Sequence, residues 1–133
     1  MTPGIKVESK AAVDAFRLYS KKLDGLVGKA IKESAIIVER DAKASFKKRG
    51  DPSVYNEPPR SDTGRLRASI THRTGETDSE MYAEVGTNVE YGPDVEHGTS
   101  QTMPHPFMSY ALGMNQHDIN EKIADAVKAA ENA

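Results

Sequence analysis

The chain has 133 residues, a formal net charge of −2 and no cysteine, and its length is that of one ordinary domain. Leu, Ile, Val and Phe together supply only 24 residues, but the small net charge argues against a disordered chain. The lack of cysteine excludes a disulfide scaffold and thiolate metal sites. We also expect no membrane span and no secretory signal, because no apolar run is long enough. The composition therefore predicts a single domain, residues 1–133, with a thin core that is stabilised by neighbouring copies.

Charge is distributed unevenly along the chain. Residues 40–73 carry nine Lys/Arg and four Asp/Glu, whereas residues 74–133 carry two and eleven. A basic middle and an acidic end suit head-to-tail contacts between copies, and such contacts make a ring when they close. The alternative is that both charge runs are simply solvated faces.

The first third of the chain has a helical pattern. Residues 5–7 suit a short edge strand. Ser9 is a capping residue, and from there apolar residues recur every three or four positions as far as Phe46, which predicts an amphipathic helix. Gly25 and Gly28 weaken its middle, so the pattern fits either one long helix or a helix pair.

Residues 50–62 are predicted to form a loop. Pro52, Pro58 and Pro59 are incompatible with a helix interior or a central strand. Loops of this length without their own structure are usually functional or disordered. We expect this one to be mobile in the isolated subunit and to become ordered against a neighbour.

The remainder alternates short strand patterns with a final helix. A capped turn at residues 62–67 is expected to lead into a strand at residues 68–73, and turn formers then precede a second strand at residues 81–85. Residues 89–91 and 94–96 are further short extended candidates. Pro106 suits the first turn of a helix that Gly113 and Asn115 interrupt, and residues 118–130 form a strongly amphipathic helix. The predicted fold is α+β, with three to four mainly antiparallel strands between a long N-terminal helix or helix pair and a C-terminal amphipathic helix.

The sequence carries no nucleotide-binding, serine-hydrolase or zinc-protease motif, so we expect no catalytic activity and no cofactor. Asp94, Glu96, His97 and His105 are the one group that resembles metal ligands, but their spacing matches no recurrent site. Histidines hydrogen-bonded to solvent are the favoured interpretation, and no metal is expected.

Four arginines of the basic segment, Arg49, Arg60, Arg65 and Arg67, are the candidate assembly interface. They suit an acidic surface on an adjacent subunit or on the next ring. Phosphate contacts are the alternative, although Tyr55 is the only aromatic residue between Lys47 and Arg73, which supports base stacking poorly.

Four short segments in this order carry a resemblance. They are T-G-R-L-R-A-S-I at residues 63–70, V-G at 85–86, Y-G-P-D-V-E-H-G-T at 91–99 and P-F-M-S-Y-A-L at 106–112. Together they resemble the small tail-component family of long-tailed phages and prophages, the gene-product-ten-like group of the Hong Kong lambdoid phage. The motif positions are Thr63, Gly64, Leu66, Ser69, Ile70, Gly86, Tyr91, Glu96, Gly98, Thr99, Pro106, Phe107 and Ala111. Two positions depart from the family pattern: Gly92 replaces a common alanine and His97 replaces an aromatic residue.

The resemblance implies a structural protein of the virion, located in the neck or minor tail and assembled in the cytoplasm of a bacterial host. It implies a ring of six copies that joins head to tail, contacts head-closure, tail-terminator or tail-tube proteins, meets DNA only as the contents of its lumen and touches no membrane. A tail-terminator ring that caps the tail tube and a DNA-binding accessory protein remain as alternatives.

Two motif residues have specific expected roles. Glu96 either accepts backbone N–H bonds that pin the returning chain or is a plain exposed glutamate. Phe107 is expected to be a core residue that anchors the C-terminal helix.

Overall fold

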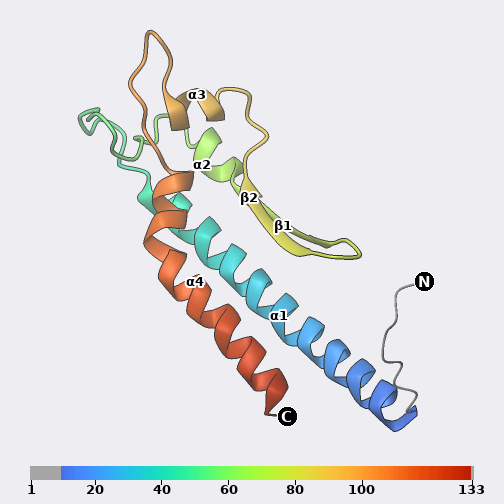
Figure 1. Cartoon of the computed structure of the whole chain (residues 1–133). Coiled ribbons are helices and arrows are strands. Elements are labelled where there is room, and N and C mark those ends of the chain that lie inside the picture. Colours follow the sequence, from blue (N-terminus) through green and yellow to red (C-terminus); the bar gives the residue numbers. More distant parts are fainter. Residues whose placement is uncertain (1–9, 133) are drawn as a thin grey trace.

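The computed structural model describes residues 10–132, so the strand expected at residues 5–7 and the capping residue Ser9 lie outside the described part. The elements follow in the order α1 (Lys10–Ser45), α2 (Arg65–Ser69), β1 (Thr71–Glu76), β2 (Met81–Gly86), α3 (Gly92–His97) and α4 (Met108–Glu131). The two long helices run side by side in opposite directions, and the β1–β2 hairpin lies along α1 beside them (Figure 1). The α2 and α3 helices and the loops gather where α1 ends and α4 begins; we call this region, residues 46–70 and 87–107, the loop end. The α+β class and the helix at each end of the chain are confirmed.

The N-terminal pattern forms one helix, not a pair. At 1.5 Å per residue, the 36 residues of α1 span about 54 Å. Gly28 does not break the helix, because packing against neighbouring elements outweighs a propensity cost of about 1 kcal/mol. A side chain there would meet the hairpin, since the sulfur of Met81 lies 3.7 Å from the position of a Cβ.

The sheet is smaller than the sequence predicted. In the part of the chain that the structure describes, it has two strands, an antiparallel hairpin that pairs Thr71 with Gly86. The extended segment expected at residues 94–96 belongs instead to α3, because Pro93 suits a first helical turn and Gly98, at φ +74°, ends the helix. Residues 89–91 form a turn before α3 rather than a strand.

The first strand also begins later than the residue 68 that the sequence predicted. Residues 68 and 69 belong to α2, and β1 begins at Thr71. Leu66 and Ile70 are both buried, and their spacing of four residues puts them on one face of a helical turn. Leu66, Ala68 and Ile70 also have the alternating spacing of a strand, so the sequence allows either a helix or a strand here. Burial of Leu66 and Ile70 selects the helix. Likewise α4 continues through Gly113 without a break.

The core lies at the loop end and is built around Phe107. Its side chain is 1% exposed and packs in one cluster with Val38, Ala42, Leu66, Ile70, Val89 and Ala111. The ring of Phe46 meets it edge-on, with centroids 5.3 Å apart and planes at 60°, a favoured aromatic geometry. Helix α1, helix α2 and the start of α4 are thus joined through one side chain.

A polar contact also fixes α4 on α1. The Asn115 side-chain amide donates to the Asp41 carboxylate at 2.8 Å and to the Ala111 carbonyl at 2.8 Å. Farther along, the Lys122 ammonium lies 3.1 Å from the Glu33 carboxylate. Hydrogen bonds from Arg40 and Asn115 hold the pKa of Asp41 below its usual range. Among the described residues, none of the helices is both apolar and long enough to pass through a bilayer.

Phe107→Ala is expected to lower the free energy of unfolding by about 3–5 kcal/mol, since it removes a fully buried aromatic ring and leaves a cavity. Chemical denaturation measures this loss. Tyr110→Ala, on an exposed position of the same helix, is the control and should change stability by about 0.5 kcal/mol or less. A loss below about 1 kcal/mol for Phe107→Ala would remove this residue from the core.

The Asp41 contact should make stability depend on pH. A carboxyl group with a lowered pKa in the folded state stabilises the protein above its unfolded pKa, and this contribution is lost as the pH falls through the folded pKa. Thermal unfolding measured from about pH 6 to pH 3 should therefore show a steeper loss for the parent chain than for Asp41→Asn. Parallel curves for the two proteins would contradict this assignment.

Candidate assembly interface

The Glu96 carboxylate caps helix α4. One oxygen accepts hydrogen bonds from the backbone N–H of Phe107 at 3.2 Å and of Met108 at 2.7 Å, and the other accepts from the Ser109 hydroxyl at 2.7 Å. A negative charge at a helix N-terminus satisfies free N–H groups and interacts favourably with the helix dipole. Of the two roles expected for Glu96, the first is confirmed: it accepts backbone N–H bonds that pin the returning chain.

The glycine and threonine after α3 shape the loop that brings the chain back to α4. Gly98 has φ +74°, and a Cβ there would lie 2.8 Å from the backbone nitrogen of Pro104, so only glycine fits. The Thr99 hydroxyl accepts hydrogen bonds from the N–H groups of Gln101 and Thr102, both at 3.1 Å. The two residues close a tight turn just before Pro106 and Phe107.

The T-G-x-L-x-x-S-I segment builds α2 and joins it to the end of the hairpin. Gly64 precedes the helix with φ +79°, and the Thr63 hydroxyl accepts the N–H of Arg65 at 3.3 Å. The Ser69 hydroxyl donates to the Leu66 carbonyl at 2.6 Å and pairs with the Thr87 hydroxyl at 2.5 Å. Near its start, the backbone of Gly64 is in the left-handed conformation. At its end, Ile70 is buried in the core.

Gly92, a departure from the family pattern, lies against this same threonine. A Cβ at Gly92 would be 2.6 Å from the Thr87 methyl group. An alanine here would require that contact to move, so the glycine suits a chain that carries threonine at position 87.

The loop at residues 50–62 lies against the turn after α3. Its base is closed where the Lys47 N–H donates to the Pro59 carbonyl at 2.8 Å. The His105 ring contacts the loop through both nitrogens: Nδ1 is 3.0 Å from the Glu57 carbonyl oxygen and Nε2 is 2.8 Å from the Ser53 hydroxyl. The loop contains no helix or strand, as expected. Its mobility in the isolated subunit stays a prediction.

Two of the four residues that resembled metal ligands have partners inside the protein. Glu96 is bound to α4, and His105 to the loop. Within residues 10–132, His, Asp and Glu side chains form no group of three or more that could hold a metal ion.

Two of the four candidate arginines line one small cleft at the loop end, and a third stacks on a ring that lines it. Arg60 and Arg67 line this space of about 280 Å³ together with Tyr91, and the Arg65 guanidinium lies over the Tyr91 ring at 5.6 Å. Arg67 Nε donates to the Lys43 carbonyl at 2.9 Å, and Arg60 Nε is 3.0 Å from the Asp62 carboxylate. Arg49 is exposed just beyond the end of α1. The side chains of all four are exposed, and contacts inside the subunit position three of them.

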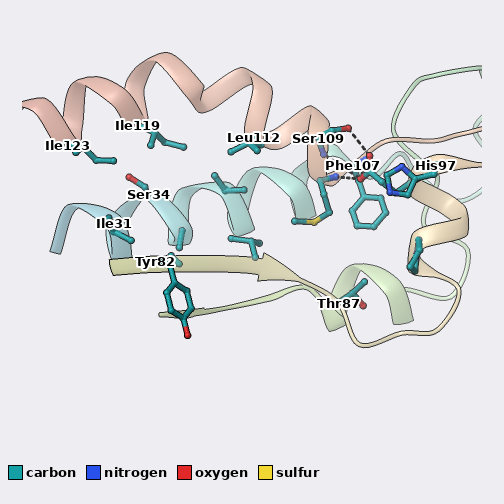
Figure 2. Close-up of a pocket in the computed structure, with 18 of the residues that line it drawn as sticks. Ile31, Ser34, Tyr82, Thr87, His97, Phe107, Ser109, Leu112, Ile119 and Ile123 are labelled. Atoms are coloured by element: carbon teal, nitrogen blue, oxygen red, sulfur yellow. Dashed lines mark hydrogen bonds between the residues drawn. The ribbon is translucent and has the colours of Figure 1, made fainter. Parts of the chain in front are cut away.

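The sequence interpretation missed a second surface, an open apolar groove of about 760 Å³. Its floor is α1, with Ile31 and Val38, and its walls are α4, with Leu112, Ile119 and Ile123, and β2. Figure 2 shows the side chains of α4 lying above those of α1, with β2 on the opposite side. The apolar periodicity of each element is visible in the sequence, but it does not tell whether an apolar face is covered or open.

Removing the Glu96 cap should destabilise α4 selectively. We expect Glu96→Ala to cost about 1–2 kcal/mol of unfolding free energy, and Glu96→Gln, which keeps an acceptor oxygen but no charge, to cost less. Urea denaturation checks both. Glu90→Ala, at an exposed glutamate outside the helices, is the matched control, and equal losses at positions 90 and 96 would argue against capping.

No curated protein and no solved structure matches this chain significantly. One protein-family model does match it, and its description reads "Bacteriophage HK97-gp10, putative tail-component". The match covers residues 10–98, from the start of α1 to the glycine that ends α3. It therefore includes the T-G-x-L-x-x-S-I, V-G and V-E-x-G segments, and it confirms the resemblance seen in the sequence. The chain belongs to the HK97-gp10-like family of phage tail components.

Proposed function

We propose that the chain is a non-enzymatic structural subunit of the phage neck, which assembles into a ring and joins the head to the tail. Family membership supports a tail role, and the observation that carries the proposal is the set of exposed arginines held at the loop end. The Tyr91 ring orients Arg65, and the Lys43 carbonyl orients Arg67. Positively charged groups that are fixed before binding lose little entropy on docking.

The partner surface in this proposal is acidic. Exposed arginines bind carboxylates through paired, charge-assisted hydrogen bonds. One such contact is weak, but a ring presents many copies at once, so their contacts act together through effective concentration. The arginines of one ring would then form a tight joint with the next layer of the neck.

Nucleic-acid binding explains the same arginines less well. The segment between Lys47 and Arg73 has a single aromatic residue, Tyr55, which gives little platform for base stacking. The distinction can be measured, because phosphate binding falls steeply with salt.

The test reverses the charge of Arg49 and Arg65 together in the phage gene. Arg67→Glu is avoided because it would also remove the hydrogen bond to the Lys43 carbonyl at the end of α1. We expect Arg49→Glu/Arg65→Glu to lower the yield of infectious particles about a hundredfold or more, with unjoined heads and tails accumulating. Electron microscopy and plaque counts provide the measurement.

The control is Lys128→Glu, which changes an exposed charge near the far end of α4 and should leave the yield unchanged. Circular dichroism must show that both variants fold. Normal yield from the double variant would contradict the proposal. Salt-sensitive retention of the parent protein on DNA, lost in the double variant while particles still join, would favour the nucleic-acid alternative.

A further inference from the structure

We propose that the apolar groove takes the N-terminal turns of α1 from a second copy of this chain. This contact would join neighbouring copies in the proposed ring, so the inference rests on the proposed function. It names the two surfaces of the subunit that meet. We call residues 10–22 the arm and keep the name groove for the space between α4 and β2 over α1.

The arm continues the face of α1 that packs on the rest of the subunit. Phe16, Leu23, Val27, Ala30 and Ser34 follow at helical spacing, so they form one stripe. Ala30 and Ser34 are buried and Leu23 and Val27 are partly buried, whereas Phe16 is 69% exposed. Toward the N-terminus, α4 no longer covers this stripe, because α1 extends past the end of α4 (Figure 1).

Every residue from 10 to 18 is exposed, and three of them are large and apolar: Val13, Phe16 and Leu18. Val13 and Phe16, three residues apart, lie on the same face of the helix. Exposed apolar side chains that gather at one place on a small protein mark a surface that binds another protein. An amphipathic helix that lays its apolar side chains in a hydrophobic groove is a common mode of recognition.

The groove is suited to such a helix. Its walls carry Leu112, which is 48% exposed, along with Ile119 and Ile123. Small-molecule sites add a few polar groups that fix the ligand, but here the Glu96 and Ser109 side chains, which line the groove, already bind each other. An apolar segment of protein therefore fits this surface better than a polar ligand.

The distribution of charge favours contact between the arm of one copy and the groove of another over contact between two arms or two grooves. The arm carries four Lys/Arg and one Asp, whereas β2, α3 and α4, which flank the groove, carry seven Asp/Glu and two Lys. Two arms, or two grooves, would therefore repel each other, and an arm and a groove attract. A contact between two different patches of the same protein is heterologous, and it generates a ring when the rotation closes.

The chain contains no cysteine, so single cysteines report contacts directly. The variants are Phe16→Cys in the arm and Leu112→Cys or Ile123→Cys in the groove, each purified alone and then mixed in pairs under mild oxidation. Because each protein has one thiol, any disulfide joins two copies. The pairs are followed by non-reducing electrophoresis and mass spectrometry, in the purified protein and in assembled particles.

We expect arm-to-groove disulfides at about tenfold or more the yield of arm-to-arm and groove-to-groove disulfides, because a formed contact raises the local thiol concentration. Tyr55→Cys is the matched control: Tyr55 is 67% exposed, much like Phe16, but it lies in the loop, and its pairing with Leu112→Cys should stay at background. Adding Lys21→Glu and Lys22→Glu to the arm variant should lower the arm-to-groove yield severalfold.

Dominant arm-to-arm disulfides would show that the arms pair with each other, and disulfides between the groove and a different virion protein would identify another occupant. Either result, or background yields throughout, overturns the inference. Rings that join heads to tails without arm-to-groove disulfides would refute this contact and leave the proposed function standing. Arm-to-groove disulfides in a protein absent from virions would support the contact and refute the neck role.

Discussion

The fold depends on one charged interaction, the Glu96 carboxylate at the N-terminus of α4. Its two oxygens bind the first N–H groups and the first hydroxyl of that helix, and so decide where α4 begins and in which direction it leaves the loop end. Phe107, the residue next to the cap, then enters the core between α1 and α2. Because the Glu96 carboxylate binds the N–H of Phe107 itself, electrostatic and apolar terms fix the same turn. The antiparallel packing of α4 along α1 in Figure 1 follows from where α4 begins and from its direction there.

The lengths of the elements explain why the subunit leaves surfaces open. Helix α1 has 36 residues and α4 has 24. Because α1 ends and α4 begins at the loop end, the shorter α4 cannot cover the whole length of its antiparallel partner. The two-stranded hairpin adds a narrow wall beside α1. The result is a groove along the long helices and an exposed stretch of α1 beyond them. A chain with few large apolar residues buries its core at one end and presents the remaining apolar side chains to solvent.

The two proposed contacts use different physical forces at different places. The loop end offers arginines that are fixed by Tyr91 and by the end of α1, which suits a charged joint with another layer. The long helices offer an apolar groove and an apolar arm of opposite charge, which suits contact between equal copies. A subunit with this division can close a ring through one pair of surfaces and dock that ring through another. Thin cores and oligomerisation go together in small domains.

The sequence by itself determined the elements with a long, unambiguous period. The apolar spacing over residues 13–46 predicted a long helix or helix pair, and the spacing over residues 119–130 predicted the C-terminal half of α4. Turn formers at residues 74–79 predicted the hairpin, and the family segments marked Glu96 and Phe107. Tertiary structure decided the rest. Residues 66–70 fit two periods, and burial of Leu66 and Ile70 against Phe107 selected the helix. Residues 94–96 became helical between Pro93 and Gly98. The groove could not be predicted from the sequence, because it exists only where α1, β2 and α4, which are far apart in the chain, lie together. Periodicity tells which face of an element is apolar, but not whether another element covers that face.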